Sequence, residues 1–313
     1  MKLKTAVVGV GHLGRFHAQK HKMMEISQLI GVCDANREQA EKVAAELGVS
    51  AYSDAKDLIK EGVNAVTVAA STPAHYELVK LFLQNGVHVL VEKPIASTSK
   101  QAEELCDLAE KKNLVFQVGH VERFNPAFAA AREKITKPQF IECHRLAPFK
   151  VRSTDVDVVL DLMIHDLDVV LSLVNSEPTS VSAVGSPVLT KVLDLANARI
   201  EFASGAVANL TASRVSQNTQ RKFRVFQPDQ YVSIDFHLGE VNILTKTGEW
   251  KDDNLPIDHK QLNLEKGDAL LAETKSFLEA VGSGGKALVS GRDGLRALKL
   301  AEAIIEDARR RLV

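Results

Sequence analysis

The sequence predicts an α/β protein that combines a doubly wound parallel sheet with a second, α+β domain built on a large, mostly antiparallel open sheet. Three observations lead to this fold class. Residues 1–120 alternate short β-rich runs with helical patterns. A glycine-patterned turn, "GVGHLG", follows the first run. After Thr179, runs such as "ANARIEF" and "YVSIDF" alternate apolar and polar residues, as half-buried strands do.

The N-terminal part contains repeated strand–helix–strand patterns. Several of its helical patterns end at a glycine that suits a left-handed cap, namely Gly48, Gly62 and Gly86. Ser53 and Thr98 are the expected N-caps of two helices. This alternation requires a parallel sheet with right-handed crossovers. The expected strands are 4–9, 28–33, 64–69, 87–91 and 114–118, with a weak one at 50–52.

The rhythm changes after residue 120, so we expect domains at 1–120 and 121–313. A helix is expected at 126–135, with Pro126 in its first turn. A strand ("FIECHRLAPF") and a long helix at 156–174 follow. The strands between 179 and 246 have one apolar face for helices to cover. Their other face must be solvated or buried against another subunit. Helices at 269–281 and after Asp293, the expected cap, end the chain.

The composition excludes several classes of function. The chain has 313 residues, with 39 basic and 40 acidic side chains and only 5% aromatics, which does not favour nucleic-acid binding. No apolar stretch approaches the roughly 20 residues of a membrane span. The opening "MKLKTAVVGVGHLG" is too short and too glycine-rich for a secretion signal. Three cysteines without paired spacing fit a reducing cytoplasm, where we expect the protein.

The turn "AVVGVGHLGRFH" has the G-x-G-x-x-G spacing at Gly9, Gly11 and Gly14. It follows a strand and opens a helix, which is the context of a dinucleotide-binding Rossmann domain. His12 and Leu13 are expected to contact the cofactor together with the three glycines. In this motif the first glycine permits a tight turn, the second lets a pyrophosphate approach, and the third lets helix pack on strand. The N–H groups at the helix start are expected to bind the diphosphate.

The cofactor is expected to be NAD, with NADP the less favoured alternative. Asp34 ends the second strand, where a carboxylate accepts hydrogen bonds from the ribose hydroxyls and repels a 2′-phosphate. Arg37 lies nearby in the sequence, and its positive charge weakens the preference for NAD over NADP. His17 and His21 lie one helical turn apart, a spacing that can bind zinc. No third ligand accompanies them, so we expect a solvated helix face and no metal site.

Two further stretches carry candidate catalytic residues. In "VEKPIAST", an apolar strand stops at Glu92, Lys93 and Pro94, near the carboxyl ends of strands where a dinucleotide binds. In "DVVLDLMIHDLDVVLSLV", a polar stripe runs along an otherwise apolar helix, which must meet partners or face a cleft. A capped helix with a satisfied core histidine is the alternative interpretation. The stripe comprises Asp157, Asp161, His165, Asp168 and Ser172, with Asp166 off it.

Together these pieces resemble the Gfo/Idh/MocA oxidoreductases, whose members include glucose–fructose oxidoreductase and inositol dehydrogenase. Glu-Lys-Pro after the fifth strand is the most specific mark, and the Asp-x-x-x-His pair is the second. The stretches that carry the resemblance span the chain: "GVGHLGRFHAQ", "ASTPAHYELV", "VLVEKPIA", "DLMIHDLDVV" and "VSGRDGLRALKLAEA".

The resemblance implies roles for individual residues. Lys93 would contact the nicotinamide ribose region and the substrate hydroxyl, His165 would be the catalytic acid/base, and Asp161 would support it. Glu92 joins the cofactor contacts. The resemblance also implies a homodimer or homotetramer formed through the second domain's sheet. Four residues would line the nicotinamide side of the groove: Ser71, Thr72, Pro73 and His75.

The expected activity is hydride transfer between a secondary alcohol of a sugar or nucleotide sugar and NAD(P). "GHVERFNPAF" with "DLMIHDLD" looks most like a bacterial branch that contains UDP-N-acetylglucosamine 3-dehydrogenases. There Arg123 and Asn125 would contact substrate or cofactor, or alternatively anchor a helix N-terminus. Unlike many members, this chain has no glycines before its Asp-x-x-x-His. A dehydrogenase of a non-sugar cyclic substrate (inositol or dihydrodiol type) and a non-catalytic NAD-binding regulator are the alternatives.

Overall fold

The computed structural model describes residues 2–151, 154–249, 251, 253, 256–265 and 267–312. The chain divides into two compact units. Unit 1 comprises residues 1–121 and 268–295, and unit 2 comprises residues 122–267 and 296–313. Among the described residues, no helix has the length and apolar character that a membrane crossing requires.

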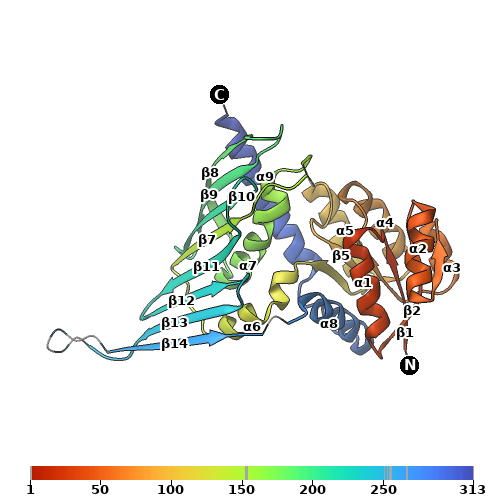
Figure 1. The fold of residues 1–313 in the computed structure, drawn as a ribbon, viewed down its shortest axis with the longest axis horizontal. Helices are drawn as coiled ribbons and strands as arrows, with labels where there is room; N and C mark the ends of the chain where they lie inside the picture. The colour runs from red at the N-terminus through yellow and green to blue at the C-terminus, as the bar shows by residue number, and fades with distance from the viewer. Residues whose placement is uncertain are drawn as a thin grey trace. The chain divides into compact units, whose positions relative to one another are not determined.

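Unit 1 is built on a six-stranded parallel sheet with the order β3-β2-β1-β4-β5-β6. Figure 1 shows strands of this sheet beside their crossover helices. The order reverses between β1 and β4, as in a doubly wound fold. Its strands are β1 (Leu3–Val8), β2 (Ser27–Cys33), β3 (Ser50–Tyr52), β4 (Ala65–Val68), β5 (His88–Glu92) and β6 (Phe116–Gly119). Its crossover helices are α1 (His12–Met23), α2 (Arg37–Leu47), α3 (Ala55–Lys60), α4 (Thr72–Gln84) and α5 (Ser99–Lys111).

The central strands are buried on both faces, which explains their continuous apolar runs. Every residue of β4 is buried, and so is all of β5 except His88. Thr98 caps α5 by accepting from the Gln101 amide, as the sequence predicts. The expected cap Ser53 is wrong by one residue, because Asp54 accepts from the Lys56 amide at the start of α3.

A segment from far along the chain completes unit 1. Helix α8 (Ala269–Ser283) packs Phe277 and Leu278 against Leu90 and Val115 of the parallel sheet. Helix α9 (Gly291–Arg310) begins in unit 1 and continues in unit 2. Its start is a reciprocal capping box, in which the Ser290 hydroxyl and Asp293 carboxylate each accept from the other's amide. Asp293 thus lies inside the first turn rather than ahead of it.

Unit 2 is built on an eight-stranded sheet with the order β14-β13-β12-β11-β7-β10-β9-β8. Neighbours are antiparallel except β7 and β10. Its strands are β7 (Phe140–Leu146), β8 (Pro178–Ser186), β9 (Leu195–Phe202), β10 (Val207–Ser213), β11 (Gln220–Gln227), β12 (Gln230–Asp235), β13 (Glu240–Lys246) and β14 (Ile257–Asn263). The fold class predicted from sequence is therefore confirmed for both sheets.

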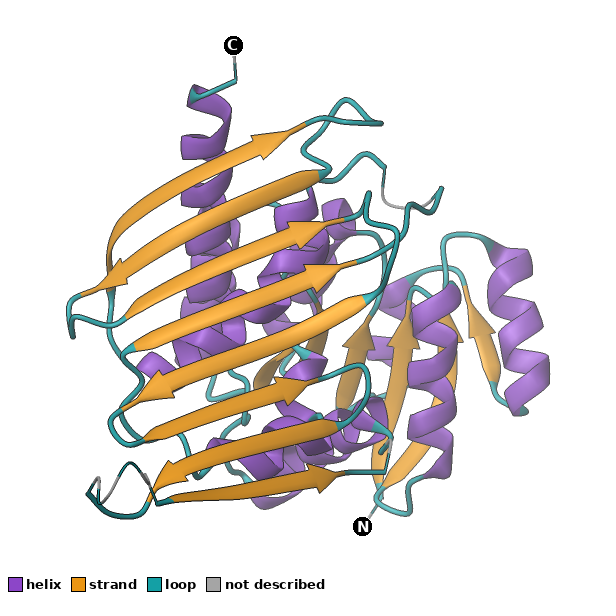
Figure 2. Ribbon diagram, turned by 60° about the vertical axis from the view of Figure 1, so that its left-hand side comes forward, coloured by secondary structure: helices purple, strands orange, loops and turns teal. Residues whose placement is uncertain are grey.

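Helices cover one face of the unit 2 sheet. Helix α6 (Pro126–Arg132), helix α7 (Ile164–Val174) and the part of α9 beyond residue 295 contribute to one apolar core with the sheet. Ala198, Ile200 and Phe202 of β9 face this core, and their neighbours Asn197, Arg199 and Glu201 face the other way. No helix of the described part of the chain covers that second face (Figure 2). The alternating pattern of the sequence records this one-sided burial.

The helix predicted at 156–174 is different in the structure. A π-helical turn, η2 (Val159–Met163), precedes α7. The turn contains Asp161, and α7 contains His165. A π-helical turn widens the spacing of side chains, so the polar stripe drawn at regular helical spacing does not hold.

We predict that Phe277→Ala lowers the free energy of unfolding by about 3–5 kcal/mol, because it leaves a cavity beneath the parallel sheet. Urea denaturation followed by circular dichroism measures this. Met23→Ala is the control, because Met23 is 66% exposed and its truncation leaves no cavity. A loss below about 1 kcal/mol for Phe277→Ala would show that α8 contributes little to unit 1.

Candidate active site

In the glycine turn between β1 and α1, two glycines have no space for a side chain and the third has open space around it. Gly9 has a φ of 82°, and an added Cβ would lie 2.3 Å from the Ala70 amide nitrogen. A Cβ on Gly14 would lie 1.8 Å from the Gly9 carbonyl oxygen. At Gly11, the N-cap of α1, a Cβ would meet nothing within 4 Å. Gly9 and Gly14 therefore close the turn on its strand and helix, while Gly11 keeps the helix start accessible.

Asp34 is held beside this turn. Its carboxylate accepts from the amides of Val10 at 2.8 Å and Asn36 at 2.9 Å. Arg37 pairs with Glu41 on its own helix, at 2.7 Å and on the surface. The carboxylate thus occupies the predicted ribose end of the groove, and Arg37 is engaged with another acid.

The predicted nicotinamide side begins at the N-terminus of α4. Ser71 is the N-cap, its side chain makes no cap hydrogen bond, and Thr72 and Pro73 form the first turn. His75 is 1% exposed, and its ring nitrogens each lie 2.9 Å from a backbone carbonyl oxygen, those of Pro94 and Ala70. Burial lowers its pKa. The ring therefore holds the backbone of the Glu-Lys-Pro turn, and a direct cofactor contact for it stays a prediction.

Glu92 is the last residue of strand β5, and Lys93 follows it at the carboxyl end of the strand. Glu92 is buried, Lys93 is half-buried, and the Lys93–Pro94 peptide bond is cis. The Glu92 carboxylate accepts from His17 Nε2 at 2.7 Å and from the Lys93 amide at 3.2 Å. Burial acts to raise the pKa of Glu92, but the hydrogen bond and charge of His17 and the charge of Lys93 outweigh it and lower that pKa. Glu92 is therefore ionised at neutral pH.

The expectation of a solvated face for His17 and His21 is wrong. Both are fully buried, and His21 Nε2 bonds the Thr67 hydroxyl at 2.8 Å. Burial and the charge of His17 lower the pKa of His21 to about 3. The missed signal is that both histidines share a helix face with Gly14 and Ala18, whose small side chains mark close packing on the sheet. Conversely, the apolar residues Leu13, Phe16 and Met23 are exposed.

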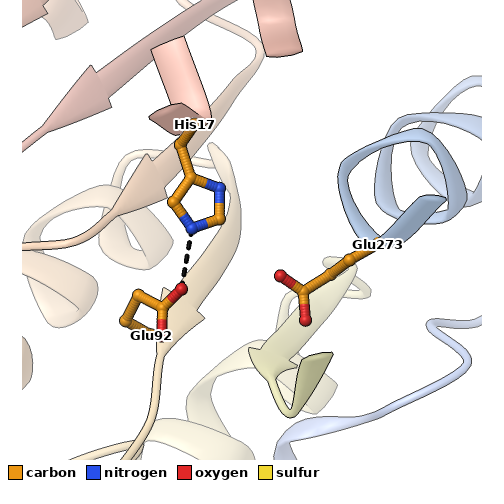
Figure 3. Close-up of side chains that lie close together, drawn as sticks. All are labelled: His17, Glu92 and Glu273. Carbon is orange, nitrogen blue, oxygen red and sulfur yellow. Dashed lines mark hydrogen bonds and ion pairs between the residues drawn. The ribbon is translucent and has the colours of Figure 1, made fainter. Parts of the chain in front are cut away.

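His17 and Glu92 have a third buried neighbour, Glu273 of α8, which sequence analysis did not single out (Figure 3). Among the described residues, these three form a group with donors for a metal ion, and their ligand atoms lie within 4.8 Å of one another. However, the 2.7 Å between His17 and Glu92 is shorter than the ~3.4 Å between two ligands of a tetrahedral zinc ion. A hydrogen bond describes that pair better than metal ligation.

In unit 2, the structure divides the predicted polar stripe. Asp161 and His165 are half-buried. Asp157 is buried and accepts from the Leu193 amide and from Arg309, both at 2.9 Å. Asp168 is buried and pairs with Arg123 at 3.3 Å. Asp157 and Asp168 are thus buried in ion pairs, whereas Asp161, His165 and Ser172 of the predicted stripe are half-buried.

Arg123 and Asn125 are placed as anchors. Arg123 is only 8% exposed, beside Asp168. The Asn125 side chain caps α6 by accepting from the Ala127 amide, as the alternative interpretation has it. A contact of either residue with substrate stays a prediction.

A buried ion network fixes the neighbouring elements. Arg145 of β7 donates to Asp166 of α7 at 2.8 and 2.9 Å and to Glu122 at 2.9 Å. Burial opposes the charge of Arg145, but the two carboxylates outweigh it and raise its pKa. Asp166, which lies off the predicted stripe, therefore connects α7, the helix that contains His165, to the sheet.

Comparison with known proteins identifies the family. The family described as "Oxidoreductase family, NAD-binding Rossmann fold" matches residues 3–120, and the "GFO/IDH/MocA C-terminal domain" matches residues 132–229. UDP-N-acetylglucosamine 3-dehydrogenase from Acidithiobacillus ferrooxidans is 41% identical over 96% of this chain and 95% of that protein. This chain belongs to the Gfo/Idh/MocA family. It is an NAD-binding oxidoreductase.

Two solved structures and one further relative are also similar to this chain. A crystal form of the Acidithiobacillus enzyme superposes with a TM-score of 0.92 at 39% identity, covering 99% of both chains. Myo-inositol 2-dehydrogenase from Thermotoga maritima is 28% identical over 96% of this chain and 95% of that protein. Levoglucosan dehydrogenase, solved with NADH, has a TM-score of 0.88 over 99% of this chain and 98% of its own, and at 21% identity it shows the fold alone.

The residues of unit 1 suit the NAD that this family binds. The first turn of α1 has no acidic residue and no side-chain cap at Gly11, so its amide groups are available to a diphosphate. Asp34 suits two ribose hydroxyls, and its negative charge disfavours a 2′-phosphate.

We predict that Asp34→Ala weakens NAD binding about 10- to 100-fold, the loss expected for hydrogen bonds to a charged acceptor. Isothermal titration calorimetry measures this. Glu38→Ala is the matched control, because Glu38 is an exposed acid four residues further on. Equal affinities for the Asp34 variant and the unaltered protein would contradict the assigned ribose site.

Proposed function

We propose that this protein oxidises the 3-hydroxyl of UDP-N-acetylglucosamine to a ketone with NAD⁺. The observation that supports this most is the 41% identity to a UDP-N-acetylglucosamine 3-dehydrogenase along 96% of the chain. The lysine after β5 and the Asp161/His165 pair provide the acid–base groups that the reaction requires. The more distant inositol 2-dehydrogenases make a cyclic polyol the second candidate substrate.

The chemistry requires a hydride to leave carbon and a proton to leave oxygen. When bound, NAD⁺ supplies the acceptor of the hydride. His165 is proposed as the base that takes the hydroxyl proton, oriented and kept basic by Asp161. Lys93, as an ammonium, stabilises the developing alkoxide and holds the hydroxyl toward the base.

A panel assay tests the substrate. Purified protein with NAD⁺ is offered UDP-N-acetylglucosamine, UDP-N-acetylgalactosamine, N-acetylglucosamine and myo-inositol, and NADH absorbance is followed. The proposal predicts turnover with UDP-N-acetylglucosamine and little with the free sugar. Faster turnover of myo-inositol would favour the second candidate, and no turnover of any alcohol in either direction would favour a non-catalytic regulator.

We predict that Lys93→Met and His165→Asn each lower kcat by about 10²- to 10⁴-fold, the range for loss of a positioned acid or base. NAD affinity should change by less than about tenfold, because the diphosphate and adenosine ribose contacts remain. Lys100→Met, on the exposed start of α5, is the control for loss of a lysine. Full activity in both variants would refute the assignment of the acid–base groups.

We further propose that the open face of the unit 2 sheet pairs with a second copy of the chain. This face carries an aromatic cluster in which Phe226 lies 5.6 Å from Phe140 and 5.0 Å from Tyr231 between ring centroids. Phe226 is 38% exposed. Sedimentation velocity should show dimers or tetramers that Phe226→Glu dissociates, whereas a monomeric unaltered protein would contradict the proposal.

A further inference from the structure

The imidazole ring of His75 lies between two backbone carbonyl groups. His75 belongs to α4 and is 1% exposed. Its Nδ1 lies 2.9 Å from the Pro94 carbonyl oxygen, and its Nε2 lies 2.9 Å from the Ala70 carbonyl oxygen. Both distances are those of N–H···O hydrogen bonds. Each nitrogen of one buried ring therefore faces an atom that can only accept a hydrogen bond.

A neutral imidazole cannot donate to both of these oxygens. It carries one N–H group, and its other nitrogen is an acceptor, whereas the imidazolium ion carries two N–H groups. With a neutral ring, the second nitrogen presents a lone pair to a carbonyl oxygen, and the two atoms repel each other. The contacts of His75 are therefore both favourable only when the ring is protonated.

The two carbonyl groups belong to turns that follow adjacent parallel strands. Ala70 follows β4, and Pro94 follows β5. Ala70 also lies against the glycine turn, because an added Cβ on Gly9 would be 2.3 Å from the Ala70 amide nitrogen. Both turns lie at the carboxyl edge of the sheet, where a doubly wound fold binds its dinucleotide. His75 thus connects the neighbour of the glycine turn to the turn that contains Lys93.

Charged groups lie close to this ring. The negative charge of Glu92, at the end of β5, acts on His75. Glu92 is itself hydrogen-bonded to His17 of α1 at 2.7 Å, and Lys93 follows it in the chain. On α4, the neighbouring acid Glu77 is exposed. The charge of Glu92 favours the protonated form of the ring.

Burial opposes that proton. It is the largest effect and lowers the pKa of His75, while the carbonyl groups of Pro94 and Ala70 and the charge of Glu92 raise that pKa. The net result is a pKa below the ordinary value, so the ring is neutral at neutral pH and gains a second N–H group in more acidic solution.

We propose that His75 is a positioning residue that connects the Glu-Lys-Pro turn to the turn after β4, and that it bonds both turns only in its protonated form. The neutral ring bonds one carbonyl group, and the second proton adds the other bond and closes the two turns on each other. This inference rests on the role proposed above for Lys93, whose turn His75 holds, but its first test requires neither substrate nor turnover.

Carbonyl NMR measures the two bonds directly. Protein labelled with carbonyl-¹³C proline and ¹⁵N isoleucine gives two correlations, because the sequence has two Pro–Ile pairs, 94–95 and 256–257. Pro256→Ala assigns them. Carbonyl-¹³C alanine with ¹⁵N serine reports Ala70, and Ser71→Ala identifies its signal. From about pH 8 to about pH 5, one of the two carbonyl carbons should move downfield as it gains a hydrogen bond, at the midpoint of the His75 ring titration.

Two amide variants separate the bonds. Asn places its amide nitrogen near the position of Nδ1, and Gln places its own near that of Nε2. His75→Asn therefore retains a donor to Pro94, His75→Gln retains a donor to Ala70, and neither side chain titrates. The pH-dependent carbonyl shift should vanish in both. His88→Gln is the matched control and should keep the shift, because His88 lies at the opposite end of β5 and bonds the Val115 amide.

Turnover gives the second measurement. For the proposed reaction, His75→Gln should lower kcat about two- to tenfold, the factor that corresponds to one hydrogen bond. The KM for NAD⁺ should stay within about twofold, because the glycine turn and Asp34 are unaltered. His75→Asn, which retains the bond to Pro94, should restore most of kcat. Equal losses of kcat in the two variants would contradict a role in positioning the Glu-Lys-Pro turn.

The carbonyl signals decide the inference. It would be overturned if the Pro94 and Ala70 carbons both stayed unchanged while His75 titrates, or if His75 took up no proton above about pH 5. A pH-dependent shift that persists in His75→Asn would also overturn it, because another group would then cause the shift. Failure of the proposed function would instead appear as absence of turnover by the unaltered protein, while the carbonyl shift still follows the His75 titration.

Discussion

The burial of an ionised carboxylate at the carboxyl end of β5 is the interaction on which the rest of the site depends. A charge in the core of a parallel sheet is costly unless hydrogen bonds and an opposite charge meet it. Glu92 obtains a hydrogen bond from the His17 ring, which requires α1 to present a polar face to the sheet. The glycine turn fixes the start of that helix. The hydrogen bond between His17 and Glu92 therefore connects the helix that follows the dinucleotide turn to the end of β5, where Lys93 follows.

Unit 2 also contains buried charged side chains, and there a network of ion pairs stabilises them. Arg145 joins Asp166 and Glu122 in a buried network, which fixes α7 against the sheet and leaves Asp161 and His165 partly accessible. Removing one partner of such a network leaves a buried charge unpaired, which typically lowers the free energy of unfolding by about 3–5 kcal/mol. In each unit, a buried ionic group thus holds an element in which an adjacent residue, Lys93 or His165, is the candidate for proton transfer.

Features that depend on residues close together in the sequence were predictable from it. Period-two alternation identified the open sheet, and the glycine spacing with Asp34 identified the dinucleotide turn. Partners from distant segments were not predictable. The sequence alone predicts a solvated His17, because its buried neighbours, Glu92 and Glu273, come from the distant strand β5 and helix α8. Regular helical spacing predicts that Asp157 and Asp168 share a stripe, but a π-helical turn lies between them and they pair with different residues, Arg309 and Arg123.

The central proposal is that Lys93 and His165 act on the same hydroxyl group. A crystal structure of the protein with NAD⁺ and UDP-N-acetylglucosamine, with turnover suppressed by low temperature, measures this most directly. The account predicts that Lys93 Nζ and a ring nitrogen of His165 both lie within about 3.2 Å of the sugar 3-hydroxyl oxygen. A complex in which either atom contacts another group, with the 3-hydroxyl held by different side chains, would contradict it.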